Sequence, residues 1–108
     1  MPKLTNEQKF NNQLDRAERG AFSRVSAFII LRGAQYIGRV KFAHGVQGGV
    51  KAFIWDWSNE AETTVQYADG TFPNYAMQGV TLCGVTITGA DYWYNELEAA
   101  GLTVIQAV

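Results

Sequence analysis

The sequence has few of the residues that most often carry chemistry. It contains one cysteine, Cys83, and one histidine, His44. A single cysteine excludes an internal disulfide and any zinc site built from several cysteines. The longest uninterrupted aliphatic and aromatic run covers positions 27–31, far short of the roughly 20 residues that a membrane helix needs. The amino-terminal residues lack the apolar region of a signal peptide, so we expect a cytoplasmic protein that does not span a membrane.

Positive charge is missing from the second half of the chain. All nine lysines and arginines lie at or before Lys51, together with three acidic residues, so residues 1–51 carry a net charge of +6. Residues 52–108 contain seven acidic residues and no basic one, which gives −7. The net charge of −1 hides this split. It indicates charged partners or self-association between opposite charges, and it is no evidence about the fold.

The chain does have enough apolar surface for a core. Of its 108 residues, 47% are hydrophobic and 13% are aromatic, which excludes a disordered chain and fits one domain over residues 1–108. Residues 50–57 concentrate this character, because Phe53, Trp55 and Trp57 lie within eight positions. We expect this segment to be a strand that is apolar on both faces and central to the core.

The amino-terminal segment has the pattern of a helix. Thr5 and Gln8 have the spacing of a capping box, in which each side chain bonds the amide of the other residue. An apolar stripe at helical spacing consists of Phe10, Leu14 and Ala17. We expect the helix to end at Gly20 and to lie on another element along one edge.

A meander of strands is predicted next. Residues 21–31 and 35–43 alternate with a period of two, and Arg32-Gly33 between them fits a tight hairpin turn. If these two residues form the loop, Val25 faces Val40 and apolar residues meet on one face. The opposite face is then basic and pairs Arg24 with Lys41 and Ser26 with Arg39. A glycine-rich loop over residues 44–49 leads to the strand at 50–57, and residues 63–67 form a fourth strand at the edge.

The second half predicts a short element, a helix and a last strand. Thr71 can cap a short helix over residues 73–78 that Gly79 ends, and an extended conformation fits these residues nearly as well. Residues 80–87 form a short buried strand or extended segment. The next helix opens at Thr88 with Asp91 and closes at Gly101. Its apolar stripe consists of Trp93, Leu97 and Ala100. Residues 102–108 form the final strand.

This order of elements predicts an α+β domain with a mainly antiparallel sheet. Its centre is a meander of three to four strands, preceded by an N-terminal helix and followed by a C-terminal helix and a short strand.

No group of residues has the spacing of a catalytic or metal site. His44 has no second ligand nearby, which is typical of an exposed loop histidine. Cys83 lies in a segment without charges, as a buried unreactive thiol does. The glycines at 45–49 lack the lysine of a phosphate loop and lead into a strand. The acidic turn residues Asp56, Glu60 and Glu62 indicate a solvated surface. We therefore expect no catalytic residues, no metal and no cofactor.

Two surfaces are candidates for binding. The first combines basic residues with aromatics of the strand at 50–57, and its candidates are Arg24, Arg39, Lys41, Lys51, Trp55 and Trp57. If these residues share one face with Phe28, Ile37 and Phe53, three interpretations stay open. The face is a floor that a helix covers, a protein-binding surface, or a groove in which single-stranded nucleic acid stacks on aromatic rings. The second candidate is the acidic helix face with Glu96 and Glu98.

Four stretches resemble small uncharacterised accessory proteins of bacteriophages and prophages. They are residues 20–33, 36–43, 53–57 and 97–108, and they carry strand and helix patterns without a catalytic motif. The resemblance implies a non-enzymatic protein of the bacterial host cytoplasm that binds a host protein or ribonucleoprotein complex. Inhibition of a host defence complex, of the anti-CRISPR or anti-restriction type, is the activity that it implies. A nucleic acid is the alternative partner, and the charge asymmetry or an edge strand could also support a homo-oligomer.

Overall fold

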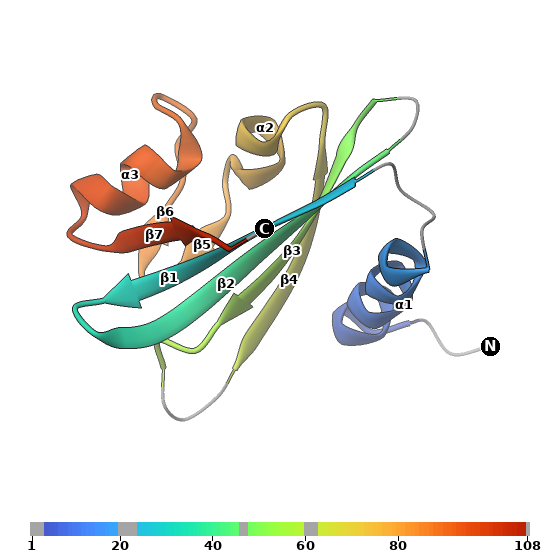
Figure 1. The fold of residues 1–108 in the computed structure, drawn as a ribbon, viewed down its shortest axis with the longest axis horizontal. Helices are drawn as coiled ribbons and strands as arrows, with labels where there is room; N and C mark the ends of the chain where they lie inside the picture. The colour runs from blue at the N-terminus through green and yellow to red at the C-terminus, as the bar shows by residue number, and fades with distance from the viewer. Residues whose placement is uncertain (1–3, 20–23, 46–47, 60–62, 108) are drawn as a thin grey trace.

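The computed structural model describes residues 4–19, 24–45, 48–59 and 63–107. It confirms the α+β class, with α1 on one face of a sheet and α2 and α3 on the other (Figure 1). The elements are α1 (Asn6–Glu18), β1 (Arg24–Arg32), β2 (Gln35–His44), β3 (Val50–Asp56), β4 (Thr64–Gly70), α2 (Pro73–Met77), β5 (Thr81–Leu82), β6 (Val85–Thr86), α3 (Trp93–Ala99) and β7 (Thr103–Gln106). No helix among these residues is long and apolar enough to cross a membrane.

The main sheet has five strands in the order β4-β3-β2-β1-β7, and all neighbours are antiparallel. The predicted meander therefore forms, and the last strand returns to pair with β1 at the sheet edge. Within β3, Ala52, Phe53 and Ile54 are fully buried. This strand is apolar on both faces, as its composition predicts. A separate hairpin of β5 and β6 lies outside the sheet.

The β1–β2 register differs from the predicted one, and the difference moves side chains to other faces. Arg32 pairs with Gln35, so the loop is Gly33-Ala34, and Gly33 takes a φ of 62°. A two-residue hairpin loop with glycine first needs a positive φ at that glycine, whereas the predicted loop would have put Arg32 there. The register also shifts at Ile37, because Leu31 pairs with Tyr36 and Ile30 pairs with Gly38. The moved loop and this bulge together pair Val25 with Ala43, three residues from the predicted Val40. An odd shift exchanges the faces of one strand relative to the other.

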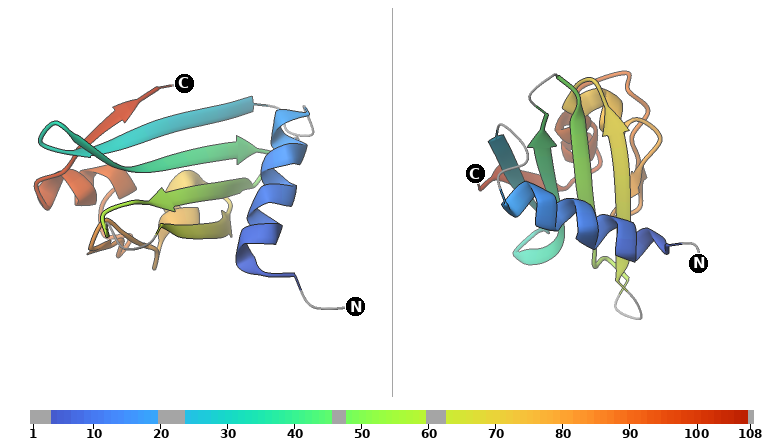
Figure 2. Two further views of the ribbon diagram at one scale, coloured as in Figure 1. Left: turned by 90° about the horizontal axis from the view of Figure 1, so that it is seen from below. Right: turned by 90° about the vertical axis from the view of Figure 1, so that its right-hand side faces the viewer.

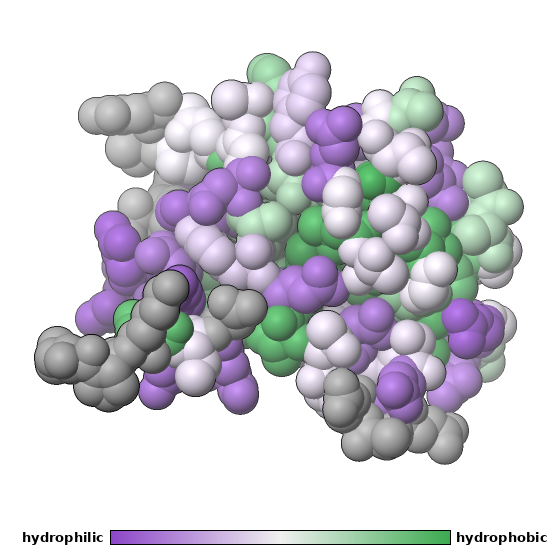
Figure 3. Space-filling view, turned by 180° about the vertical axis from the view of Figure 1, so that it is seen from behind, coloured by the Kyte–Doolittle hydropathy of each residue, from purple (hydrophilic) through white to green (hydrophobic). Residues whose placement is uncertain are grey.

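The hydrophobic core has two parts, one on each face of the sheet. The larger part packs α2, α3 and the β5–β6 hairpin on β1–β3 and includes Ile30, Phe42, Ile54, Trp93 and Leu97. The smaller part packs α1 on the opposite face and consists of Phe10, Ala17, Ala43 and Phe53. Figure 2 shows α1 lying across one end of the strands. Figure 3 shows hydrophilic residues gathered over α1 and a hydrophobic patch on the side of the molecule away from it.

The start of α1 agrees with the predicted capping box. The Gln8 amide donates to Thr5 Oγ1 at 3.1 Å, and the Thr5 amide donates to Gln8 Oε1 at 2.8 Å. Phe10 and Ala17 are buried and Leu14 is half-buried, so the predicted stripe is the packed edge. The predicted stop, Gly20, lies outside the described residues.

The starts of α2 and α3 differ from the predictions. The residue that precedes α2 is Phe72 and not Thr71, and the residue that precedes α3 is Tyr92 and not Thr88. Thr88 instead bonds Glu96, which holds the loop before α3 against that helix. Ala100 is exposed, so the packed stripe of α3 reduces to two residues, Trp93 and Leu97. Residues 80–87 form a hairpin instead of one strand.

Candidate binding surfaces

Helix α1 covers only part of the face on which it lies. The Phe10 ring packs edge-on against Phe53, with ring centroids 5.3 Å apart, and against Trp55, with centroids 4.7 Å apart. These contacts bury Phe53 completely and leave Trp55 half-buried. The floor that was predicted to be either covered or offered to a partner is thus divided. Its Phe53 end lies under the helix, and Trp55 marks the boundary.

Beyond α1 the same face continues as a surface that we call the open platform. It consists of Ile29, Tyr36, Arg39, Lys41, Trp55, Trp57 and Ile105. The strand register places these residues together, because Ile29 pairs with both Arg39 and Ile105, and Arg39 pairs with Trp55. Residues paired in this way share a face. In Figure 2 no other helix of the described chain lies over this part of the sheet.

Aromatic and cationic side chains contact one another on the open platform. The guanidinium carbon of Arg39 lies 5.1 Å from the centroid of the Trp55 ring. Tyr36 stacks on Trp57 with centroids 5.2 Å apart and planes 32° apart. The Tyr36 side chain is 43% exposed, and that of Ile105 is 48% exposed. A cation over a ring contributes about 0.5–1 kcal/mol at exposed sites, so this contact helps to hold Arg39 and Trp55 in place.

Arg24 does not belong to the open platform. It pairs with His44 on the face that carries Ser26 and Phe28, so the predicted grouping of Arg24 with Arg39 and Lys41 is wrong. Phe28 and Ile37 also pack in the core on the α3 side, contrary to the prediction. His44 is a half-buried residue at the end of β2 and not an exposed loop residue. Its burial and the charge of Arg24 lower the pKa of His44.

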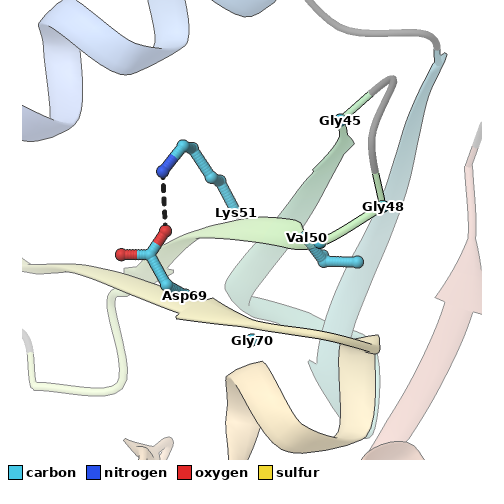
Figure 4. A pocket seen from close by; sticks show the side chains of 7 residues that line it. Gly45, Gly48, Val50, Lys51, Asp69 and Gly70 are labelled. Carbon is cyan, nitrogen blue, oxygen red and sulfur yellow. Dashed lines mark hydrogen bonds and ion pairs between the residues drawn. The ribbon is translucent and has the colours of Figure 1, made fainter.

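Lys51 lies on the α1 face, where it pairs with the buried Ala43, and its ammonium group is engaged. Nζ donates to Asp69 Oδ1 and to the Tyr67 hydroxyl, both at 2.7 Å. Partial burial disfavours the charge, and the bonds to Asp69 and Tyr67 outweigh it, so the pKa of Lys51 is raised. A hollow of about 150 Å³ adjoins this pair and is lined by Gly45, Gly48, Gly49, Val50, Lys51, Asp69 and Gly70 (Figure 4). The carboxylate beside the lysine makes this hollow a poor anion site.

The two acidic candidates on α3 have different surroundings. Glu96 accepts hydrogen bonds from the Thr88 hydroxyl at 2.6 Å, the Thr88 amide at 2.9 Å and the Gly89 amide at 3.1 Å. The Thr88 bonds are the main reason that the pKa of Glu96 is lowered. Glu98 is exposed, and its carboxylate has no such partner among the described residues. Glu96 is therefore a structural carboxylate, and Glu98 is available for contact.

Cys83 and Asp56 form a structural unit at the β5–β6 turn. Cys83 has a φ of 53°, its amide donates to Asp56 Oδ2 at 2.9 Å, and its thiol is buried. Burial, followed by the charge of Asp56, raises the pKa of the Cys83 thiol to about 12, which agrees with an unreactive thiol. Asp56 is half-buried, in contrast to the solvated turn residue that was predicted. Glu60 and Glu62 lie outside the described residues. The described part of the chain contains no group of three or more His, Cys, Asp or Glu residues that could hold a metal ion.

Sequence reasoning missed Tyr36 and Ile105 as platform residues. The wrong hairpin register placed Tyr36 opposite Ile29, within the apolar core face. The preference for glycine at the first position of a two-residue loop would have corrected the loop, but Tyr36 would then pair with Leu31, on the same face of β1 as Ile29. To predict Ile105 as a platform residue, one must know that β7 pairs with β1, and no local pattern gives that pairing.

Comparison with known proteins found no counterpart. No family model, no curated protein and no solved structure matches the chain.

Proposed function

We propose that the protein is a non-enzymatic accessory protein of a bacteriophage or prophage that binds a macromolecule of the bacterial host. Its target in the host cytoplasm is a protein or ribonucleoprotein complex, and its activity is inhibition of a defence complex of the anti-CRISPR or anti-restriction type. The observation that carries the binding role is the open platform. The resemblance of four stretches of sequence to phage accessory proteins supplies the biological context.

The composition of the open platform supports contact with a macromolecule. Tyrosine, tryptophan and arginine are the residues that dominate binding energy in protein interfaces, and Tyr36, Trp57 and Arg39 lie together here. Trp55 is fixed from below by Phe10, so part of the surface is ordered before a partner arrives. Ordering side chains in advance reduces the entropy that binding costs.

The described titratable groups fit a binding role better than catalysis. The thiol of Cys83 is buried with a pKa of about 12. The carboxylates of Asp56 and Glu96 are engaged by backbone amides. These two carboxylates hold loops in place. General acid–base catalysis instead requires a group that can reach a substrate.

The proposal is tested by capture from bacterial lysates with a matched pair of variants. The double variant Tyr36→Ser, Trp57→Ser removes the stacked pair of the open platform. Tyr75→Ser is the control, because Tyr75 is 60% exposed on α2, away from the platform. We expect one stoichiometric partner with the wild type and with Tyr75→Ser, and its loss with the double variant. Capture of no partner in several hosts, or equal capture by all three proteins, would contradict the proposal.

A second candidate function is binding of single-stranded nucleic acid on the same platform. Arg39 over Trp55 and Tyr36 on Trp57 are specific observations that favour it, because bases stack on such rings with about 1–3 kcal/mol each. Binding of an oligonucleotide should then weaken steeply with salt and quench tryptophan fluorescence. Unchanged fluorescence at low salt would exclude this candidate and leave the protein-binding role intact.

A further inference from the structure

Helix α3 lies beside β1 and β7 on the opposite face of the sheet (Figure 1). Residues of these three elements line a second hollow. Its volume is about 160 Å³, and it is lined by Phe28, Tyr94, Glu98, Val104 and Gln106. Pockets for small-molecule ligands measure about 300–1,000 Å³. This hollow therefore has the size for one side chain of a partner and not for a whole ligand.

Two aromatic rings in this hollow are held by their neighbours. The Phe28 ring packs edge-on against the buried Trp93, with centroids 5.0 Å apart, and the Tyr94 ring packs in the same way against Tyr92 at 4.7 Å. The Phe28 and Tyr94 rings are 6.4 Å apart, and their planes are inclined by 32°. Both rings line the hollow in similar orientations, and the face of an aromatic ring carries partial negative charge that attracts a cation.

One charged group lines the hollow, and it is a carboxylate. Glu98 is exposed, and no described residue forms a hydrogen bond or ion pair with its side chain. Every lysine and arginine of the chain precedes residue 52, and none of those in the described ranges lines the hollow. Glu96, two residues away, is bonded to Thr88 and Gly89 instead. The hollow thus combines two aromatic rings with a carboxylate that no described lysine or arginine pairs with.

We propose that this hollow binds the guanidinium group of an arginine side chain from a partner protein. A guanidinium is flat, always charged and weakly hydrated, so it can stack on Tyr94 or Phe28 while two of its N–H groups donate to the Glu98 carboxylate. An ammonium group could pair with the carboxylate but would not use the flat ring surfaces in this way. The site lies on the face opposite the open platform and does not depend on it.

The test is a titration of the whole protein with N-acetyl-arginine methylamide, followed by NMR of the aromatic side chains. The neutral isostere N-acetyl-citrulline methylamide and the lysine analogue serve as control probes. We expect the arginine probe to shift the Tyr94 and Phe28 ring signals in a salt-sensitive manner. Glu98→Gln should weaken its binding about tenfold, because it removes the charge of the acceptor. Glu7→Gln, an exposed glutamate on α1, should leave the binding unchanged.

Three results would overturn the proposal. Equal shifts from arginine and citrulline probes would show that charge is not recognised, and equal affinity for the lysine probe would show that a guanidinium is not required. Self-association that Glu98→Gln abolishes, without binding of the arginine probe, would assign the hollow to a second copy of the chain. Thermal unfolding of the variant checks that its fold is kept, as the exposure of Glu98 leads us to expect.

Discussion

The two faces of the sheet are covered to very different degrees. On the α3 face, Trp93 and Leu97 are fully buried and pack over Ile30, Val40 and Ile54, which are also fully buried. On the α1 face, one helix crosses one end of the strands, and the half-buried Trp55 and the exposed Ile105 lie beyond it. The α3 face therefore carries most of the stability of the fold, and the α1 face has surface left over for binding.

The narrow apolar stripe of α1 explains the difference. Only Phe10, Leu14 and Ala17 recur at helical spacing, so α1 buries one edge and cannot extend over the sheet. The α3 face is closed by two helices and the β5–β6 hairpin together. A single narrow helix such as α1 cannot cover a whole sheet face, so part of the α1 face stays exposed.

The largest change in stability is expected when one leucine on each face, Leu97 or Leu14, is truncated to alanine. Leu97→Ala should lower the free energy of unfolding by about 2–5 kcal/mol, because Leu97 is fully buried in the larger core. Leu14→Ala should cost less than half of that, because Leu14 is half-buried at the edge of α1. Urea unfolding of both variants measures the two values. Equal losses would show that α1 contributes as much to stability as α3 does.

A medium effect concerns Asp56, which ties the β5–β6 turn to the end of β3. Its Oδ1 accepts hydrogen bonds from the Ser58 amide and hydroxyl, and its Oδ2 accepts one from the Cys83 amide. Partial burial alone would raise the pKa of Asp56, but these hydrogen bonds outweigh it, so the pKa is lowered. Asp56→Asn should cost about 1–3 kcal/mol at neutral pH.

The lowered pKa of Asp56 also predicts a dependence on pH. The folded state binds fewer protons at Asp56 than the unfolded state, whose pKa is near 3.8, so this stability is present above that pH. It is lost as the pH falls through the lower pKa of the folded state. Denaturant unfolding between pH 6 and pH 2, about the range in which carboxylates titrate, should show a smaller decline for Asp56→Asn. An identical decline in both proteins would contradict this role.

The smallest expected effect is that of the ion pair between Lys51 and Asp69. Both groups are partly exposed at the rim of the α1 face, and the pair is reinforced by Tyr67. A double-mutant cycle with Lys51→Met and Asp69→Asn should give a coupling of about 0.2–1 kcal/mol that salt reduces. A coupling well above this range would mean that the α1 face is less open to solvent at this point than its exposure indicates.

The sequence predicts those features that depend on local signals. The capping box of Thr5 and Gln8 locates α1, and alternation locates the strands of the meander. Strand parity places Arg39 with Lys41 and Trp55 with Lys51, whereas the β2–β3 register, in which Arg39 pairs with Trp55, brings the two sets to one face. Arg24 was misplaced because one residue of error in the hairpin loop, together with the bulge at Ile37, changes the register by an odd number.

Other features depend on contacts between distant segments, which periodicity does not encode. Thr88 is a good helix start by composition, but Glu96 captures its amide and hydroxyl from the following helix. The hollow beside Glu98 forms because β7 returns to β1 and brings Val104 close to Phe28 and Tyr94. Such arrangements follow from the topology of the sheet, which the local patterns of a single sequence do not reveal.

Acrylamide quenching of single-tryptophan variants measures whether the α1 face is partly open. Each variant keeps one of Trp55, Trp57 and Trp93 and replaces the other two by phenylalanine. We expect acrylamide to quench Trp57 and Trp55 readily and Trp93 hardly at all, because Trp93 is fully buried and the other two are half-buried on the open platform. Protection of Trp55 and Trp57 equal to that of Trp93 would show that the α1 face is closed.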